Sequence, residues 1–437
     1  MRLRDTIGLL LCTTLLSPGI SAASGHDDDN DLKNVVYVQS NNPQPGKNAV
    51  LGYVRNPKTG VLTEMPGSPF LTGGTGFLNS SERLGPDDAD QQFVVTADNR
   101  FLYVVNEGSG TIAGFAIQSN GSLKPVPGSP FPSGGVHPVS IGITDYLLFV
   151  VNQGDQLPGG AGGTHKPTYA SFLQLGQGTL IPLPEPQPSQ VAGSSPTQAL
   201  ISPNGRLLFD ANLFENPFNN TGLPPFIPPF SSELHSYYVT PIGILVPAAK
   251  TAPPSPIPPF ILGLQAHPTQ KILYAGFVVA SAIGTYTYDD NGHMTFVGTA
   301  PGAPNGGLCW IAISPNAKNL YTSDAITDQI DVYSIADPLH PVLTQTVNLA
   351  GIKNPANFNV TATLWDTTPF QLQTSPDGAF LYVVNHQETV GGNATGNALH
   401  ILKIGTGGTL TEIPSSPLVF PASEVPNNAH PLGVAVF

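Results

Sequence analysis

TSPDGAFLYVVN, Thr374 to Asn385, is the stretch that decides the fold, because related copies of it recur along most of the chain. VTADNRFLYVVN ends at Asn106 and GITDYLLFVVN ends at Asn152, while more divergent copies begin at Ile201, Ala266 and Ile313. Each copy has a turn of Pro, Asn, Asp or Gly followed by an apolar, β-branched and aromatic run, the pattern of a tight turn leading into a strand. A turn and a strand that recur in this way along the chain predict a propeller or a related array.

Composition supports an all-β fold. The 437 residues include 47 Gly and 46 Pro, which are poor in helix interiors, and 40% hydrophobic residues, which suffice for a large core. We expect six complete four-stranded blades, at residues 91–126, 138–183, 197–247, 260–298, 308–349 and 369–413. The remaining fragments complement each other, because residues 34–42 begin at a second strand and HPLGVAVF at the C-terminus is a lone first strand. The sequence therefore predicts a seven-bladed β-propeller closed by pairing of the C-terminal strand with the first blade.

The N-terminus has the pattern of a secretory signal peptide. Arg2 and Arg4 precede an apolar stretch that is too short to span a bilayer, and small residues follow it. We therefore expect a signal peptide at residues 1–23, an acidic leader at 24–33 and one propeller domain at 34–437, with a secreted (extracellular or periplasmic) location. After processing, Cys309 is the only cysteine, so no intrachain disulfide is expected.

The net charge of −13 argues against some partners. Nucleic-acid binding requires a basic surface, so no nucleic acid is expected, and no apolar run is long enough for a membrane span. The expected partner is a small molecule or a protein, and the expected state is a monomer. No metal and no other cofactor is expected, because HExxH, paired CxxC and phosphate-cradle patterns do not occur.

Loop lengths point to one face of the ring. If each first strand starts at the top face, the short turns such as SPDG and SPNG lie at the bottom. The long connections then lie at the top, at residues 74–90, 153–166, 213–232, 350–368 and 386–396. Insertions that gather on one face of a repeat fold usually mark its binding face. The alternative is that Gly- and Pro-rich loops vary in length without function.

Polar side chains are expected around the channel mouth on that top face. As catalytic candidates we take Glu107, His137 and His386. As binding candidates we take Asn106, Asn152, Gln153, Asp155, Asp210, Glu215, Asp324 and His430. Each has a structural alternative: the repeated Asn suits a strand end or turn, and His137 and His430 both precede Pro at the start of a first strand.

At this point the chain resembles the lactonase-type seven-bladed propellers, which include 6-phosphogluconolactonase-like, carboxymuconate-cyclase-like and YVTN-repeat proteins. The resemblance rests on SPDGAFLYVVN, on the PGSPF segments and on the GxL turns at residues 60–62, 121–123 and 408–410, and it covers residues 34–437. It implies the fold and, for the family's enzymes, a lactone held at the channel mouth by basic residues beside acid or base groups.

This chain departs from the pattern of those enzymes. Their Arg-His pair at the start of a middle blade is missing from FILGLQAHP at Phe260, and YAGF at Tyr274 lacks the acid that closes a strand. Gln198 stands where a His is expected, and only Glu107 keeps an Asn-Glu pair. A phosphorylated lactone would also need Arg or Lys at the mouth, which the candidate ring hardly supplies.

Three hypotheses follow. The first is a lactonase-like propeller whose top face binds a ligand. The second is a lactone hydrolase in which Glu107, Asp210 or Glu215 is the base and His137 or His386 the acid. The third is a surface scaffold for protein interactions, since fold does not fix function.

Overall fold

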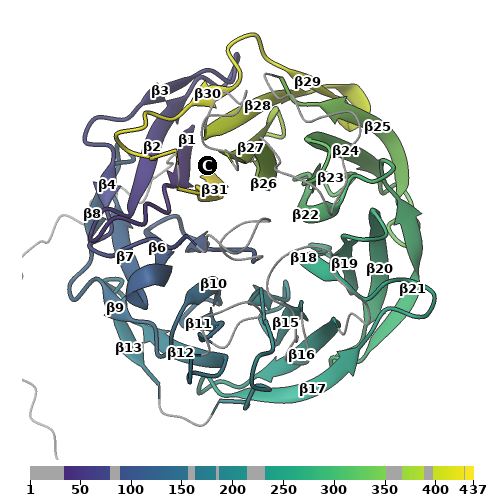
Figure 1. Ribbon diagram of the computed structural model, residues 1–437, viewed down its shortest axis with the longest axis horizontal. Coiled ribbons are helices and arrows are strands. Elements are labelled where there is room, and N and C mark those ends of the chain that lie inside the picture. The colour runs from purple at the N-terminus through teal and green to yellow at the C-terminus, as the bar shows by residue number, and fades with distance from the viewer. Residues whose placement is uncertain are drawn as a thin grey trace, which may run out of the picture. The chain divides into compact units, whose positions relative to one another are not determined.

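The computed structural model describes residues 34–78, 89–155, 163–183, 187–213, 232–350, 367–387, 397–427 and 429–437. The predicted signal peptide and acidic leader lie outside the described residues, as does Glu215. Seven antiparallel sheets are arranged as blades around a ring, which confirms the predicted seven-bladed propeller (Figure 1).

The first three blades follow one another from the closing strand. Blade one contains β31 (Leu432–Val436), β1 (Val35–Gln39), β2 (Ala49–Arg55), β3 (Leu62–Glu64) and β4 (Phe70–Leu71). Blade two contains β5 (Phe93–Val95), β6 (Phe101–Asn106), the 3-10 turn η1 (Glu107–Ser109), β7 (Thr111–Ile117), β8 (Leu123–Pro125) and β9 (Phe131–Pro132). Blade three contains β10 (Pro138–Ile143), β11 (Leu147–Asn152), β12 (Thr168–Gln174) and β13 (Leu180–Pro182).

The other four blades complete the ring. Blade four contains β14 (Leu200–Ile201), β15 (Leu207–Asn212), β16 (Glu233–Val239) and β17 (Leu245–Thr251). Blade five contains β18 (Ile261–Ala266), β19 (Ile272–Phe277), β20 (Ala282–Tyr288) and β21 (Met294–Pro301). Blade six contains β22 (Leu308–Ile313), β23 (Asn319–Asp324), β24 (Gln329–Ser334) and β25 (Val342–Asn348). Blade seven contains β26 (Thr367–Thr374), β27 (Phe380–Gln387), β28 (Ala398–Ile404), the 3-10 turn η2 (Thr406–Gly408), β29 (Leu410–Glu412) and β30 (Leu418–Val419).

The burial pattern explains why the repeated FLYVVN run is apolar throughout. Every residue of β6 and of β11 is buried, because both faces of a blade are covered by the neighbouring blades. In contrast, residues of the outermost strand β25 alternate between exposed and half-buried, as expected of a strand on the rim. The core is therefore a ring of apolar layers between blades.

The last strand closes the ring as predicted. β31 pairs antiparallel with β1, with Val36 opposite Val436 and Val38 opposite Val434. The Asn34 amide also donates to the Phe437 carbonyl at 2.7 Å. Both edges that an open ring would leave unpaired are thus hydrogen-bonded.

Two of the outermost strands extend beyond their predicted bounds. β17 and β21 continue to Thr251 and Pro301, beyond the predicted ends of blades four and five. The PGSPF segments end in short strands that pair with the third strand of the blade, as β9 pairs with β7. The PGSPF segments thus add a short strand to blades one and two, and β30 does the same in blade seven.

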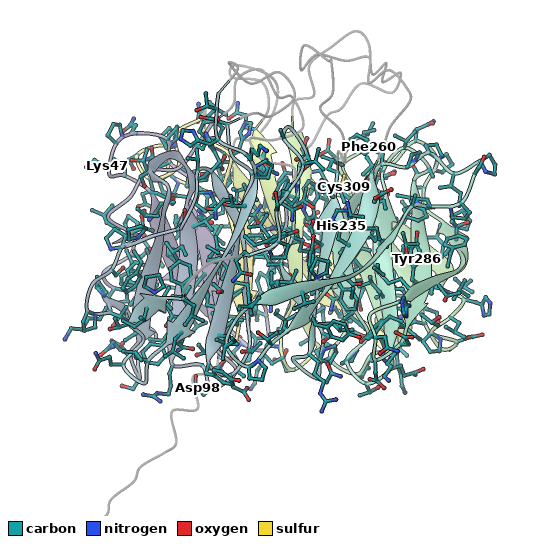
Figure 2. All side chains as sticks on the ribbon, turned by 90° about the horizontal axis from the view of Figure 1, so that it is seen from below. Lys47, Asp98, His235, Phe260, Tyr286 and Cys309 are labelled. Carbon is teal, nitrogen blue, oxygen red and sulfur yellow. The ribbon has the colours of Figure 1, made fainter. Side chains whose placement is uncertain are left out.

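The two faces of the ring are distinguished by their connections. Asp98, in the turn between β5 and β6, lies at one face, and Lys47 and Phe260 lie toward the opposite one (Figure 2). We call the first the bottom face and the second the top face. Most residues of the predicted long connections, 79–88, 156–162, 214–231, 351–366 and 388–396, lie outside the described residues. Among the described residues, no helix has the length and apolarity needed to cross a membrane.

Candidate functional site

Glu107 and His137 meet at the top face although they come from different blades. Glu107 opens η1 directly after β6, and His137 directly precedes β10. The Glu107 Oε1 and the His137 Nδ1 are 3.1 Å apart. The Glu107 side chain is 2% exposed and the His137 side chain 17%. The structure thus presents a partly accessible imidazole held by a buried carboxylate.

The His137 backbone is in a sparsely populated conformation. Its φ of 55° lies in the left-handed region, which is unfavourable for a residue with a β-carbon. The His137 carbonyl accepts a hydrogen bond from the Gln153 amide at 2.9 Å, and Gln153 Nε2 donates to Ser195 Oγ at 3.3 Å. Gln153, a predicted binding residue that directly follows β11, is therefore buried and holds the His137 backbone.

Phe77 forms a wall beside His137 that the sequence did not indicate. The two rings are in edge contact, with centroids 4.5 Å apart. Asn41 holds Phe77 in place through two hydrogen bonds of 2.9 Å, one to its carbonyl and one from its amide. Blades one, two and three thus each contribute to a single polar and aromatic cluster, Phe77, Glu107 and His137, which we call the His137 cluster.

The repeated asparagines have contacts of a structural kind. Asn106 Oδ1 accepts from Asn48 Nδ2 at 2.9 Å, and Asn106 Nδ2 donates to Thr111 Oγ1 at 3.1 Å. Asn152 Nδ2 donates to the Ser133 carbonyl at 3.4 Å. Both asparagines have no exposed surface, so these amides connect the strand end to neighbouring loops.

His386 does not join the His137 cluster. It belongs to β27 in blade seven, is fully buried, and stacks between Phe370 at 4.3 Å and His430 at 5.0 Å. Its Nε2 donates to the Pro431 carbonyl at 2.5 Å. Burial lowers the pKa of His386 to about 3, so the ring stays neutral at physiological pH. These contacts describe a core stack to which His430 also belongs.

The predicted carboxylates are likewise separated. Asp210 is fully buried, and its oxygens accept from the Thr197 and Gln198 amides at 2.9 and 3.0 Å and from the Tyr169 hydroxyl at 3.0 Å. Desolvation raises the pKa of Asp210. Asp155 instead lies at the surface, where a 2.7 Å contact with His165 lowers its pKa.

Asp324 lies in a buried carboxylate pair in blade six. Neither of its oxygens accepts a hydrogen bond from a donor among the described residues, and its neighbour is the buried Asp331. Asp331 is supplied with donors, including the Ala303 amide at 2.6 Å and Thr346 Oγ1 at 2.5 Å. Desolvation and the Asp331 charge raise the pKa of Asp324 well above its usual range. Asp324 is thus the member of the pair whose protonated form the surroundings favour.

A second feature that the sequence did not indicate is a segment that crosses the channel. Residues Ala89 to Gln92 precede β5, and the Ala89 carbonyl accepts from the Trp310 Nε1 of blade six at 2.9 Å. Asp90 Oδ1 accepts from the Gln371 Nε2 of blade seven at 2.9 Å, and Gln91 Oε1 accepts from the Gln198 Nε2 of blade four at 2.9 Å. We call residues 89–92 the channel segment, because it connects blade two with the opposite side of the ring.

Asp90 is the titratable group of the channel segment. Desolvation raises its pKa to about 7, although hydrogen bonds from the Gln91 amide and from Gln371 oppose this shift.

Among the described residues, no three His, Cys, Asp or Glu side chains are grouped as a metal site would require.

Comparisons with known proteins show which solved structures have a similar fold. No family model matches the chain. No curated protein sequence matches it either. The structure is similar to the periplasmic gluconolactonase of Pseudomonas aeruginosa, with a TM-score of 0.65 at 15% identity over 92% of this chain and 99% of that one. It is also similar to a provisionally assigned 6-phosphogluconolactonase from Bacteroides uniformis, with a TM-score of 0.61 at 15% identity over 92% and 98% of the chains.

A third similar structure is a hypothetical selenium-binding protein from Sulfolobus tokodaii, with a TM-score of 0.63 at 16% identity over 92% and 93% of the chains. Proteins with different described functions therefore share this architecture, and identities this low establish the fold alone. The seven blades, the β31–β1 closure and the similarity along nearly the whole ring together show that this chain has the fold of the lactonase-type seven-bladed propellers.

Proposed function

We propose that this chain is a secreted lactonase-like propeller that binds a small uncharged polar molecule on its top face, at the His137 cluster. The observation that carries the proposal is the 3.1 Å contact between Glu107 and a partly exposed His137. Phe77 adds an apolar surface beside the imidazole. An aromatic surface beside a few fixed polar groups is a common feature of small-molecule sites.

The charge of the cluster favours an uncharged ligand. The buried Glu107 carboxylate lies beside His137, and a negative group at this position repels phosphorylated or carboxylated molecules. Lys47 and Lys166, which lie in top-face loops, are exposed. Secretion is supported by Arg2 and Arg4 before an apolar stretch. One protein of the same fold is named as periplasmic.

The same contact favours a second candidate function, hydrolysis of a lactone. A carboxylate that accepts from Nδ1–H leaves Nε2 as the basic atom of the ring, and such a nitrogen can take a proton from water as it attacks a lactone carbonyl. In this scheme His137 is the general base and Glu107 orients it. The proton then passes to the ring-opening oxygen, which yields a hydroxy acid.

One titration and assay series tests both functions. Binding of neutral lactones, for example glucono-δ-lactone and γ-butyrolactone, is measured by calorimetry, and acid release is followed in weakly buffered solution. We expect millimolar or tighter binding that His137→Ala weakens at least about tenfold, the effect of losing roughly 1.4 kcal/mol. His165→Ala, which disrupts the surface pair with Asp155, is the matched control and should leave binding unchanged.

Turnover above buffer that falls in both Glu107→Gln and His137→Ala supports hydrolysis. Binding without turnover supports a ligand-binding protein. If no neutral lactone binds, both candidate functions are contradicted. The hypothesis of a surface scaffold for protein interactions is then favoured.

A further inference from the structure

Tyrosine hydroxyls form hydrogen bonds between neighbouring blades at four of the seven blade junctions, toward the bottom face. In four blades the second strand carries a tyrosine whose hydroxyl donates a hydrogen bond to a backbone carbonyl of the next blade. That carbonyl lies in the turn between the third and fourth strands of the next blade. The pairs are Tyr37 with Gly121, Tyr103 with Gly178, Tyr274 with Pro338 and Tyr382 with Gly60. These bonds join consecutive blades at the same level, so they close the junction between them.

Blade six departs from this rule. Its equivalent residue, Tyr321, is fully buried, and its hydroxyl has no hydrogen-bond partner among the described residues. Two positions earlier the chain has Asn319, where the other four blades have Val35, Phe101, Ile272 and Phe380. The Asn319 amide donates to the Gly407 carbonyl at 3.0 Å and thus takes over the contact with blade seven. Blades six and seven are therefore joined by the Asn319 amide and not by a tyrosine hydroxyl.

A groove of about 930 Å³ lies at this junction on the bottom face. Tyr321 lines it together with turn residues of blades five, six and seven, among them Thr269, Gln270 and Lys318. A buried hydroxyl without a partner is costly, and such groups in a groove usually await a ligand or an ordered water. Burial raises the pKa of Tyr321 to about 12, which keeps the phenol protonated and able to donate.

The charges of the groove favour an anion. Lys318 is exposed and forms no ion pair with any described residue, whereas the equivalent Lys271 in blade five is paired with Asp290 at 2.7 Å. Asp377 is the one acidic side chain among the described lining residues. Its carboxylate is already bound by the Arg55 guanidinium at 3.0 Å and by the Ala379 amide at 3.1 Å. The groove thus holds an unpaired cation and no unpaired carboxylate.

We propose that this groove binds a small hydroxylated carboxylate of the sugar-acid type. The ligand carboxylate contacts Lys318. The Tyr321 hydroxyl, which has no exposed surface in this structure, donates to the ligand once the groove lining shifts around it. Thr269 and Gln270, whose side chains have no hydrogen bond within the described structure, face the ligand hydroxyls from the neighbouring turn. The site lies on the face opposite the His137 cluster and does not depend on the function proposed there.

Calorimetric titration of the purified full-length chain with sodium glucuronate tests the proposal, with glucose as the uncharged comparison. We expect glucuronate to bind with a millimolar or lower Kd and glucose at least tenfold more weakly. Lys318→Gln should weaken glucuronate binding at least tenfold, and Tyr321→Phe about three- to tenfold. Raising the salt concentration should weaken binding of wild type, because the contact with Lys318 is an exposed ionic one.

Two controls separate this site from others. Lys271→Gln removes the equivalent, already paired lysine and should leave glucuronate binding unchanged. His137→Ala changes the top face and should have no effect either. The proposal is overturned if glucuronate does not bind, if glucose binds as tightly, or if Lys318→Gln binds glucuronate like wild type.

Discussion

The strand-end position of the repeat has a different role in different blades. Asn106 and Asn152 use their amides to tie loops together, whereas blade six has Asp324 there, beside Asp331. An amide can donate and accept at once, whereas a carboxylate only accepts. The same strand-end position thus connects loops in two blades and places a carboxylate beside a second buried one in blade six.

Asp90 in the channel segment makes stability depend on pH. Its pKa of about 7 in the folded protein exceeds the value of an unfolded Asp, near 3.9, so the folded state binds the proton more tightly. The contribution of Asp90 to stability is therefore full at low pH and is lost as pH rises toward and through about 7. Asp90→Asn keeps an oxygen for the Gln91 and Gln371 donors and should stabilise the protein at pH 8 by at least about 1 kcal/mol.

Denaturant unfolding of wild type and Asp90→Asn at pH 5 and pH 8 measures this effect. The difference in unfolding free energy should be larger at pH 8 than at pH 5, because only the wild-type carboxyl ionises. Asp98→Asn, at an exposed bottom turn, is the control. Equal differences at both pH values would contradict a raised pKa of Asp90.

The sequence predicts single residues of the candidate site but not which of them lie together. Glu107 and His137 were both singled out, yet they belong to different blades and only the ring geometry brings them into contact. Phe77 and Asp90 were missed because they flank an insertion without a repeat equivalent. His386 was expected at the mouth, but β27 extends through Gln387, beyond the strand end of the other copies, and buries it.

At the scale of strands, the pattern predicted the inner blade better than the rim. Within predicted blade two the sequence indicates a second strand over 101–106 and a third over 111–117, since a turn and a continuous apolar run define them, and β6 and β7 have these bounds. The outer strands have no such definition. β17 and β21 run to Thr251 and Pro301, past the expected ends at 247 and 298, because no continuous apolar run marks where these rim strands stop.

The tyrosine contacts between blades predict opposite outcomes for two similar substitutions. Tyr103→Phe removes a 2.8 Å hydrogen bond to the Gly178 carbonyl and leaves that acceptor buried, which should cost about 1 to 2 kcal/mol. Tyr321→Phe removes a hydroxyl that has no partner and should leave stability unchanged or raise it slightly. Thermal or urea unfolding of both variants provides the measurement, and a similar loss in both would contradict the difference between the junctions.

At the scale of the whole molecule, ring closure depends on the last strand. Removal of residues 430–437 exposes the edge of β1 and the buried side chains opposite it, so we expect an insoluble or strongly destabilised protein. A milder test is Val436→Ala, which should cost about 1 to 2 kcal/mol because Val436 is 3% exposed. Val419→Ala on the rim strand β30, where Val419 is 45% exposed, should change stability by less than about 0.5 kcal/mol. An unchanged melting curve after truncation would contradict the closure.

The channel segment has a consequence for the passage of molecules. A central opening could in principle let a solute diffuse from one face of the ring to the other. Ala89, Asp90 and Gln91 are bonded to blades six, seven and four, so backbone and amide groups stand across that route. A solute that enters the central opening from either face therefore meets the channel segment.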